Sequence, residues 1–186
     1  MAAQPSEKLI HGLLRKYVAS FPEMRTQREA VQAEFETARG KKSRKPVVEP
    51  PPEYRVDPPV RSGRVPTFDK RHAQPLSPML RARYSFASDV VAGLYHWPSL
   101  AALTKVLRGP HLTGAHRSMR EHWTGSAPNW LDDRFLSVLR VCPDVPETIT
   151  YLAWVPGRVE PKVWLCQGMD SELFEDLAAY LKYVLE

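Results

Sequence analysis

Apolar residues recur at helical spacing near both ends of the chain. The first set is Leu9, Ile10, Leu13, Leu14, Tyr17, Val18 and Phe21. Ser6 can cap a helix start and Pro22 can stop it, so we expect an amphipathic first helix that must pack on another surface. A second set in residues 171–185 predicts a final helix capped by Asp170 or Ser171, with acidic residues in its first turns.

Three runs in the C-terminal third have the composition of strands, with many apolar and β-branched residues. They are residues 134–142, 148–155 and 158–166. Pro156-Gly157 is a type II turn signal, so the last two runs are expected to form a hairpin, with Pro161 at an edge or bulge. Three strands and a final helix predict an α+β fold, a small domain of helices plus a three-stranded antiparallel sheet.

The region before these strands predicts two short helices and a loop. One helix is expected over residues 89–97 and another over residues 99–107, ended by Gly109-Pro110. Residues 111–130 are polar, basic and aromatic with little periodicity. Such a pattern predicts a loop, with room for one helical turn.

A proline-rich segment separates the first helix from this domain. Residues 41–66 read KKSRKPVVEPPPEYRVDPPVRSGRVP and contain seven prolines, seven Lys or Arg and three acidic residues. Such a segment has too little apolar surface to fold alone and favours extended or polyproline geometry. We therefore expect three parts: a helical N-terminal segment (1–39), a long extended Pro-rich basic arm (40–85) and the α+β domain (86–186).

The net charge of +5 is spread unevenly along the chain. Residues 1–85 hold 17 Lys or Arg against 9 Asp or Glu, whereas residues 131–186 hold 5 against 10. A basic arm on a domain with an acidic end favours a polyanion at one end and a different partner at the other. The alternative is a soluble protein with a solvated basic tail.

Cysteine usage and the N-terminus bear on the compartment. Two cysteines, Cys142 and Cys166, are no disulfide framework and fit a reducing compartment. No apolar run of about 18 residues is present, so we expect no membrane span. The amphipathic, mainly basic first 21 residues are typical of a mitochondrial import segment, here uncleaved, which predicts the mitochondrial matrix. An ordinary first helix is the alternative.

The sequence shows no pattern typical of an enzyme. His111, His116 and His122 lie close together, but the paired spacings of zinc sites are missing, so we expect no metal. Both cysteines fall in predicted strands, where small buried residues are common, and no nucleophile motif surrounds them. We expect no catalytic residues, no cofactor and no small-molecule substrate.

Cations and aromatic side chains are concentrated in two stretches that favour RNA as the partner. Arg neutralises phosphate and stacks on bases, Trp and His offer flat faces, and an arm with spaced cations can follow an RNA backbone. The expected contacts are Arg55, Arg61, Arg64, Arg81 and Arg83 in the arm, and Arg108, Arg117, Arg120, Trp123 and Arg140 beyond it. Lys70 and Arg71 belong to the same series of arm cations. The alternative is that the arginines are solvated and Trp123 lies in the core.

The order of several short motifs resembles a known family. Arg-Glu-His-Trp (120–123), Arg-Val-Cys-Pro-Asp (140–144), Ala-Trp (153–154) and Gly-Arg (157–158) follow one another. They resemble the family of the mitochondrial small-ribosomal-subunit protein numbered thirty-four, over about residues 107–160. The resemblance implies a structural, non-catalytic subunit of the mitochondrial ribosome that binds small-subunit rRNA and neighbouring ribosomal proteins. Arg120 and Arg140 are the contacts that it carries over.

A second resemblance and a second function stay open. The ending VWLCQGMDSELFEDLAAYL (163–181) resembles the close of the Smi1/Knr4-type immunity fold, where a strand leads to a final helix. That resemblance implies a soluble bacterial immunity protein that binds one toxin. The alternative function is a protein–protein adaptor in a large mitochondrial or cytoskeletal complex without RNA.

Overall fold

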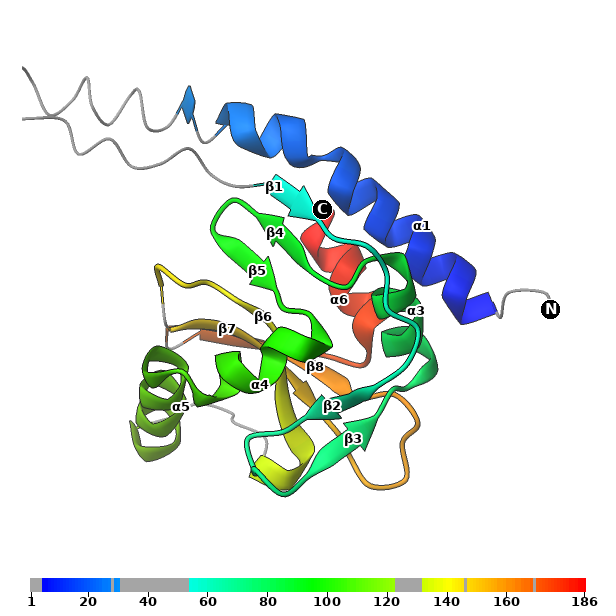
Figure 1. The fold of residues 1–186 in the computed structure, drawn as a ribbon. Helices are drawn as coiled ribbons and strands as arrows, with labels where there is room; N and C mark the ends of the chain where they lie inside the picture. The colour runs from blue at the N-terminus through cyan, green and yellow to red at the C-terminus, as the bar shows by residue number, and fades with distance from the viewer. Residues whose placement is uncertain (1–4, 28, 31–53, 123–131, 146, 169) are drawn as a thin grey trace, which may run out of the picture.

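A seven-stranded antiparallel sheet runs through the molecule (Figure 1). The structure, a computed structural model, describes residues 5–27, 29–30, 54–122, 132–145, 147–168 and 170–186. The strand order is β1-β4-β5-β6-β7-β8-β9, so from β4 onward each strand pairs with the next along the chain. The bounds are β1 Tyr54–Val56, β4 Val90–Ala92, β5 Tyr95–Trp97, β6 Leu136–Val141, β7 Thr148–Ala153, β8 Lys162–Gln167 and β9 Asp170–Phe174. The prediction of a three-stranded sheet is therefore wrong.

The three predicted strands are the long central ones, and the missed strands are short or lie at an edge. β6, β7 and β8 form the expected antiparallel neighbours, and β7 and β8 pair over six residues from Thr148↔Gln167 to Ala153↔Lys162. The helix predicted over residues 89–97 is instead the β4–β5 hairpin. Its turn needs Gly93, whose φ is +63°, a conformation that side chains with a Cβ rarely adopt.

Helices cover both faces of the sheet. Successive residues of a strand point to opposite faces, and β7 shows this at Thr150 and Tyr151. Thr150 is hydrogen-bonded to Tyr180 of α6 (Leu177–Val184), whereas Tyr151 contacts His116 of α5 (Pro110–His122). α6 and α5 therefore lie on opposite faces.

The first helix completes the face that carries α6. α1 (Pro5–Ala19) packs against α3 (Pro78–Phe86) and α6, as Figure 1 shows. Its apolar stripe enters the core, because Ile10, Leu14 and Tyr17 are at most 2% exposed. The predicted first helix is thus confirmed, and the surface that it needs is supplied by the chain itself.

The prediction of an extended arm is wrong for residues 54–85. β1 pairs with β4, residues Arg64–Pro66 (β2) and Ala73–Pro75 (β3) form a second, two-stranded sheet, and α3 follows. Residues 31–53 lie outside the described residues. Neighbouring segments offer the contacts that the arm cannot make alone. Val65 of β2 is fully buried, and Gly63 packs so tightly on Leu100 that a Cβ would lie 2.7 Å from its Cδ1.

In the second half of the chain, the structure differs from two further predictions. Residues 99–107 form α4 (Leu100–Arg108) as expected, but residues 110–122 form α5 instead of a loop. Pro110 suits the start of a helix, where its missing N–H is not needed. The predicted final helix is shorter, because residues 170–174 pair with β8 and Asp176 caps α6 through the N–H of Ala179 at 2.9 Å.

Both cysteines are free and buried. Over the described part of the chain, the helices are too short or too polar to cross a membrane.

Candidate nucleic-acid interface

A basic pocket lies where α4 and α5 meet the segment between β2 and β3. Its volume is about 560 Å³. Four cations line it: Lys70, Arg108, Arg117 and Arg120. Two carboxylates, Glu121 and Asp133, also line it, so the lining is positive on balance. We call this site the basic pocket.

Arg108, the last residue of α4, fixes the segment that carries Lys70. Its guanidinium donates hydrogen bonds to the carbonyl oxygens of Phe68 at 2.7 Å and Thr67 at 3.0 Å. Hydrogen bonds that involve a charged group are the stronger ones. Arg108 therefore holds residues 67–68 against α4 and positions the pocket wall.

His116 of α5 forms the floor together with Phe68. The two rings stack with centroids 3.9 Å apart, and His116 is only 6% exposed. Its Nε2 lies 3.0 Å from the Asp133 carboxylate, and its Nδ1 lies 3.5 Å from the Tyr151 hydroxyl. Burial lowers the pKa of His116 below its ordinary value, although the hydrogen bond to Asp133 acts in the opposite direction. A neutral ring fits both partners, with Nε2–H donating and Nδ1 accepting.

The cations at the rim of the pocket differ in whether they form an ion pair. Arg120 donates to the Asp133 carboxylate at 2.6 Å, so part of its charge is neutralised. Lys70 and Arg117 are exposed, and within the described residues neither has a carboxylate within 4.0 Å. An exposed Arg on a helix next to a partly buried ring can contact phosphate without giving up an existing ion pair.

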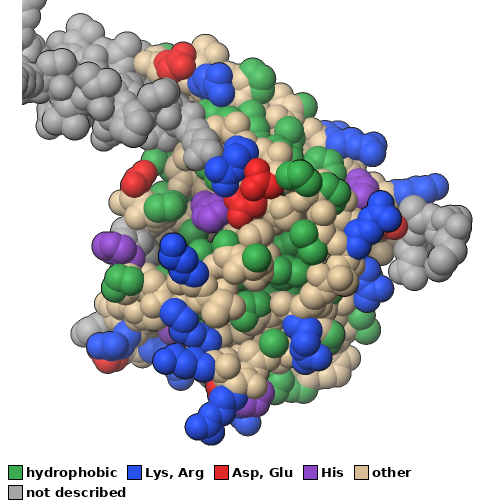
Figure 2. Space-filling model, viewed as in Figure 1, with side chains coloured by type: hydrophobic (Ala, Val, Ile, Leu, Met, Phe, Trp, Pro, Cys, Tyr) green, Lys and Arg blue, Asp and Glu red, His purple; other side chains and the backbone are tan. Residues whose placement is uncertain are grey.

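Further exposed cations surround the pocket. Arg64 of β2, Arg71 between β2 and β3, and Lys105 of α4 are all exposed. Figure 2 shows Lys and Arg side chains spread over the lower part of this face, where Figure 1 draws α5, β2 and β3, with few Asp or Glu among them. We call Arg64, Lys70, Arg71, Lys105 and Arg117 the basic surface.

The structure brings together several of the residues predicted from the sequence. Arg108, Arg117 and Arg120 line one pocket, as their closeness in sequence suggested. Arg61, just before β2, and Arg64, its first residue, are exposed, and Arg81 is exposed on α3. Trp123 lies outside the described residues.

Other predicted contacts are placed elsewhere. Arg55, at the far edge strand β1, forms ion pairs with Asp57 at 3.0 Å and Asp89 at 3.3 Å. Arg83 is 1% exposed, donates to the carbonyl oxygens of Ala87 and Trp97, and has a pKa lowered by burial. A side chain so enclosed supports the core and cannot reach a nucleic acid.

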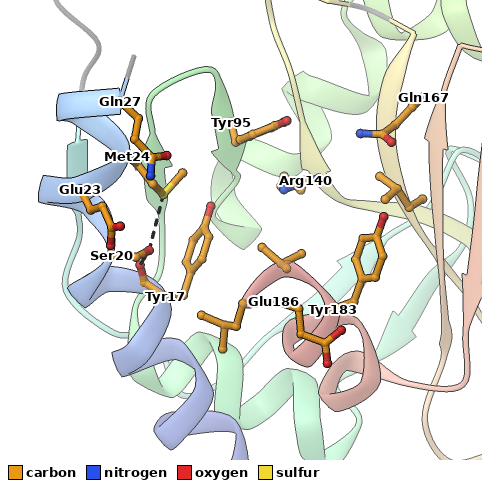
Figure 3. A pocket seen from close by; sticks show the side chains of 13 residues that line it. Tyr17, Ser20, Glu23, Met24, Gln27, Tyr95, Arg140, Gln167, Tyr183 and Glu186 are labelled. Carbon is orange, nitrogen blue, oxygen red and sulfur yellow. Dashed lines mark hydrogen bonds between the residues drawn. The ribbon is translucent and has the colours of Figure 1, made fainter. Parts of the chain in front are cut away.

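Arg140 is 5% exposed and lies on the opposite side of the sheet from the basic pocket. Its Nε donates to Thr150, the residue that faces α6, and its guanidinium faces a separate pocket (Figure 3). Phe68, by contrast, was missed. Nothing local in the sequence signals its stacking on His116, which lies 48 residues away along the chain.

Comparison with known proteins gives no family. No family model matches the chain, and neither the curated proteins nor the solved structures contain a match. Within the described residues, no three His, Cys, Asp or Glu side chains gather as the ligands of a metal ion would. The function must therefore be argued from the surface itself.

Proposed function

We propose that this protein is a non-catalytic RNA-binding subunit of a ribonucleoprotein particle, and that the basic surface contacts RNA phosphates. One observation carries the proposal. Arg117 and Lys70 stand exposed, with no ion pair to any residue in the described part of the chain, at the rim of a pocket whose lining includes the stacked rings of Phe68 and His116. Phosphate contacts by Arg and Lys supply most of the affinity for RNA, and aromatic rings favour unpaired bases.

The particle that we propose is the small subunit of the mitochondrial ribosome, in the mitochondrial matrix. This finer assignment rests on the sequence resemblance over residues 107–160. Arg120, one of the two contacts that the resemblance carries over, lines the basic pocket. Arg140, the other, is buried on the opposite side of the sheet, so we do not include it in the RNA contacts.

A salt titration of RNA binding tests direct contact. The Lys70→Gln/Arg117→Gln double variant removes two exposed cations and no ion pair known from the described residues. The slope of log affinity against log salt, measured by fluorescence anisotropy with an rRNA stem-loop, should fall in magnitude by about one per lost phosphate contact. Lys182→Gln is the matched control, because it removes an exposed cation from α6 on the other side of the sheet. An unchanged slope in the double variant would rule out phosphate contact by Lys70 and Arg117, the observation on which the proposal rests.

A second function, a protein–protein adaptor, is favoured by the edge strand β9. This strand pairs only with β8 in the described sheet, and Leu173, its second-last residue, is 42% exposed. Edge strands offer unpaired backbone groups to a partner. Sedimentation of native lysate with and without RNase separates the two functions. A ribonucleoprotein subunit shifts after digestion, whereas an adaptor stays in a particle that resists RNase.

A further inference from the structure

Arg140 lies in a second pocket that is unrelated to the basic surface. The pocket has a volume of about 640 Å³ and lies among α1, β5, β6, β8 and the end of α6. Figure 3 shows Tyr17, Tyr95, Gln167 and Tyr183 arranged around the Arg140 guanidinium. Its size is within the usual range for sites that bind small molecules. We call it the Arg140 pocket.

Among the residues that the structure describes, the positive charge of Arg140 has no carboxylate partner. Nε donates to Thr150 Oγ1 at 3.3 Å, and the guanidinium carbon lies 4.0 Å from the centroid of the Tyr95 ring. No carboxylate of the described residues lies within 4.0 Å of it. Glu23 and Glu186 also line the pocket, but neither forms an ion pair with Arg140 in the described structure.

The neighbouring tyrosines cannot neutralise this charge near pH 7. Burial raises the pKa of Tyr17, with Arg140 acting in the opposite direction, and raises the pKa of Tyr180 to about 12. Both hydroxyls therefore stay protonated. A buried charge without a counter-charge is costly, and the cost is relieved when an anion with matching hydrogen bonds arrives. Two terminal nitrogens of a guanidinium can hold one carboxylate or phosphate.

The remaining lining indicates what the body of such an anion would be. Met24, Leu165 and Val184 add apolar surface beside the tyrosine rings. Gln167 and Tyr183, both exposed, stand at the opening with groups that can donate hydrogen bonds. A ligand that satisfies both kinds of lining has one oxyanion group attached to a ring or a short apolar chain.

We propose that the Arg140 pocket binds a small organic oxyanion, a carboxylate or phosphate on an apolar or aromatic body, with Arg140 as its anchor. This binding site is separate from the RNA contacts. It adds a small-molecule ligand to a protein for which the sequence predicts no small-molecule substrate.

The test measures binding of matched probes to the full chain by isothermal titration calorimetry at constant ionic strength. Benzoate carries a carboxylate, phenyl phosphate a phosphate, and benzamide is the neutral counterpart of benzoate. We expect benzoate or phenyl phosphate to bind at least about tenfold more tightly than benzamide, as expected for a charged hydrogen-bonded pair. The tighter of the two anions identifies the headgroup.

Variants connect this binding to Arg140. Arg140→Met should weaken the preferred anion at least about tenfold and leave benzamide unchanged. Tyr183→Phe changes only an exposed rim residue, and it should weaken the anion by a smaller factor while the fold is kept. It provides the readout if Arg140→Met does not fold.

The Lys70→Gln/Arg117→Gln variant is the control and should bind the anion like the parent protein. Equal affinity for benzoate, phenyl phosphate and benzamide, no binding of any probe, or full anion binding by Arg140→Met would each overturn the proposal.

Discussion

Hydrogen bonds of the neutral His116 ring connect α5 to Asp133 and to Tyr151 of the sheet. In the neutral ring, Nε2–H donates to Asp133 and Nδ1 accepts from Tyr151, whose pKa is raised well above its ordinary value by burial. Protonation would place a second N–H on the ring, so the Tyr151 hydroxyl could no longer donate to Nδ1 and would have to accept from it. It would also place a charge in a site that is 6% exposed, next to Arg120.

Stability should therefore decrease as the pH falls below about 6.5, the ordinary pKa of histidine in an unfolded chain. The pKa of His116 is lower in the folded state, so the unfolded state binds more protons in the interval between the two values. The contribution of His116 to the free energy of unfolding therefore rises with pH across that interval. It is complete above the interval and is lost as the pH falls through it. Urea denaturation at several pH values between 7 and 5 measures this.

His116→Gln provides the comparison for this pH series. It should be less stable at pH 7 but show a flatter pH dependence between 7 and 5. Asp69, Asp132 and Glu175 do not confuse the result. Their pKa values are lowered by hydrogen bonds and ion pairs, to about 2 for Asp132, so they titrate at more acidic pH. The same slope in the variant and the parent would assign the effect to another group.

At the scale of elements, Glu160 joins the β7–β8 connection to the start of α3. Its carboxylate accepts hydrogen bonds from Ser77 Oγ at 2.5 Å and from the Met79 N–H at 2.9 Å. Ser77 is also the N-cap residue, accepting from Leu80 N–H at 3.3 Å. A carboxylate at this end of a helix satisfies free N–H groups and complements the helix dipole.

Glu160→Ala should destabilise the protein by about 1–3 kcal/mol, because it removes hydrogen bonds to a charged acceptor and leaves a helix N–H without a partner. Chemical denaturation measures the change. Glu175→Ala, between β9 and α6, is the matched control. Its carboxylate pairs with Arg158 and Lys162 but is 64% exposed, so the loss of stability should be clearly smaller than for Glu160→Ala. Equal effects of the two substitutions would mean that Glu160 does not act as a cap.

The sequence could reveal long periodic elements but not short ones. β6, β7 and β8 are six residues each, enough for composition to indicate strands, whereas three residues of β4 or β5 cannot show a period. α5 was missed for a different reason. Its inward face is Leu112, Ala115, His116 and Met119, a thin apolar stripe that includes a histidine, so the helical pattern is weak within a mostly polar stretch.

The candidate site was predictable to the extent that it is local. Arg108, Arg117 and Arg120 lie on neighbouring helices and were found from their closeness in sequence. Arg83 and Arg140 have the same chemistry, but burial beside Tyr84 and Tyr95 gives them other surroundings. Burial of an arginine depends on contacts between distant segments, such as that of Arg140 with Thr150 and Tyr180, and no local pattern reports it.

On the scale of the whole molecule, α1 belongs to the same core as the sheet. Tyr17 receives a hydrogen bond from Trp97 Nε1 of β5 at 3.4 Å, and their rings lie 5.5 Å apart. Ile10 and Leu14 are buried against α3 and α6. The N-terminal helix, the segment around β1 and the C-terminal helix thus share one continuous hydrophobic cluster. We expect these parts to unfold together.

Leu14→Ala tests this cooperativity. Leu14 is 1% exposed, and truncation of a buried leucine costs about 2–5 kcal/mol. Far-UV circular dichroism reports mainly the helices, and tryptophan fluorescence has contributions from all five tryptophans, of which Trp97 and Trp164 lie in the sheet. Both probes should show the same lowered urea midpoint, because a residue in α1 then stabilises the whole structure. Leu9→Ala, on the same helix but 42% exposed, should change stability by no more than about 0.5 kcal/mol. A fluorescence midpoint that Leu14→Ala leaves unchanged would instead make α1 a separately attached segment.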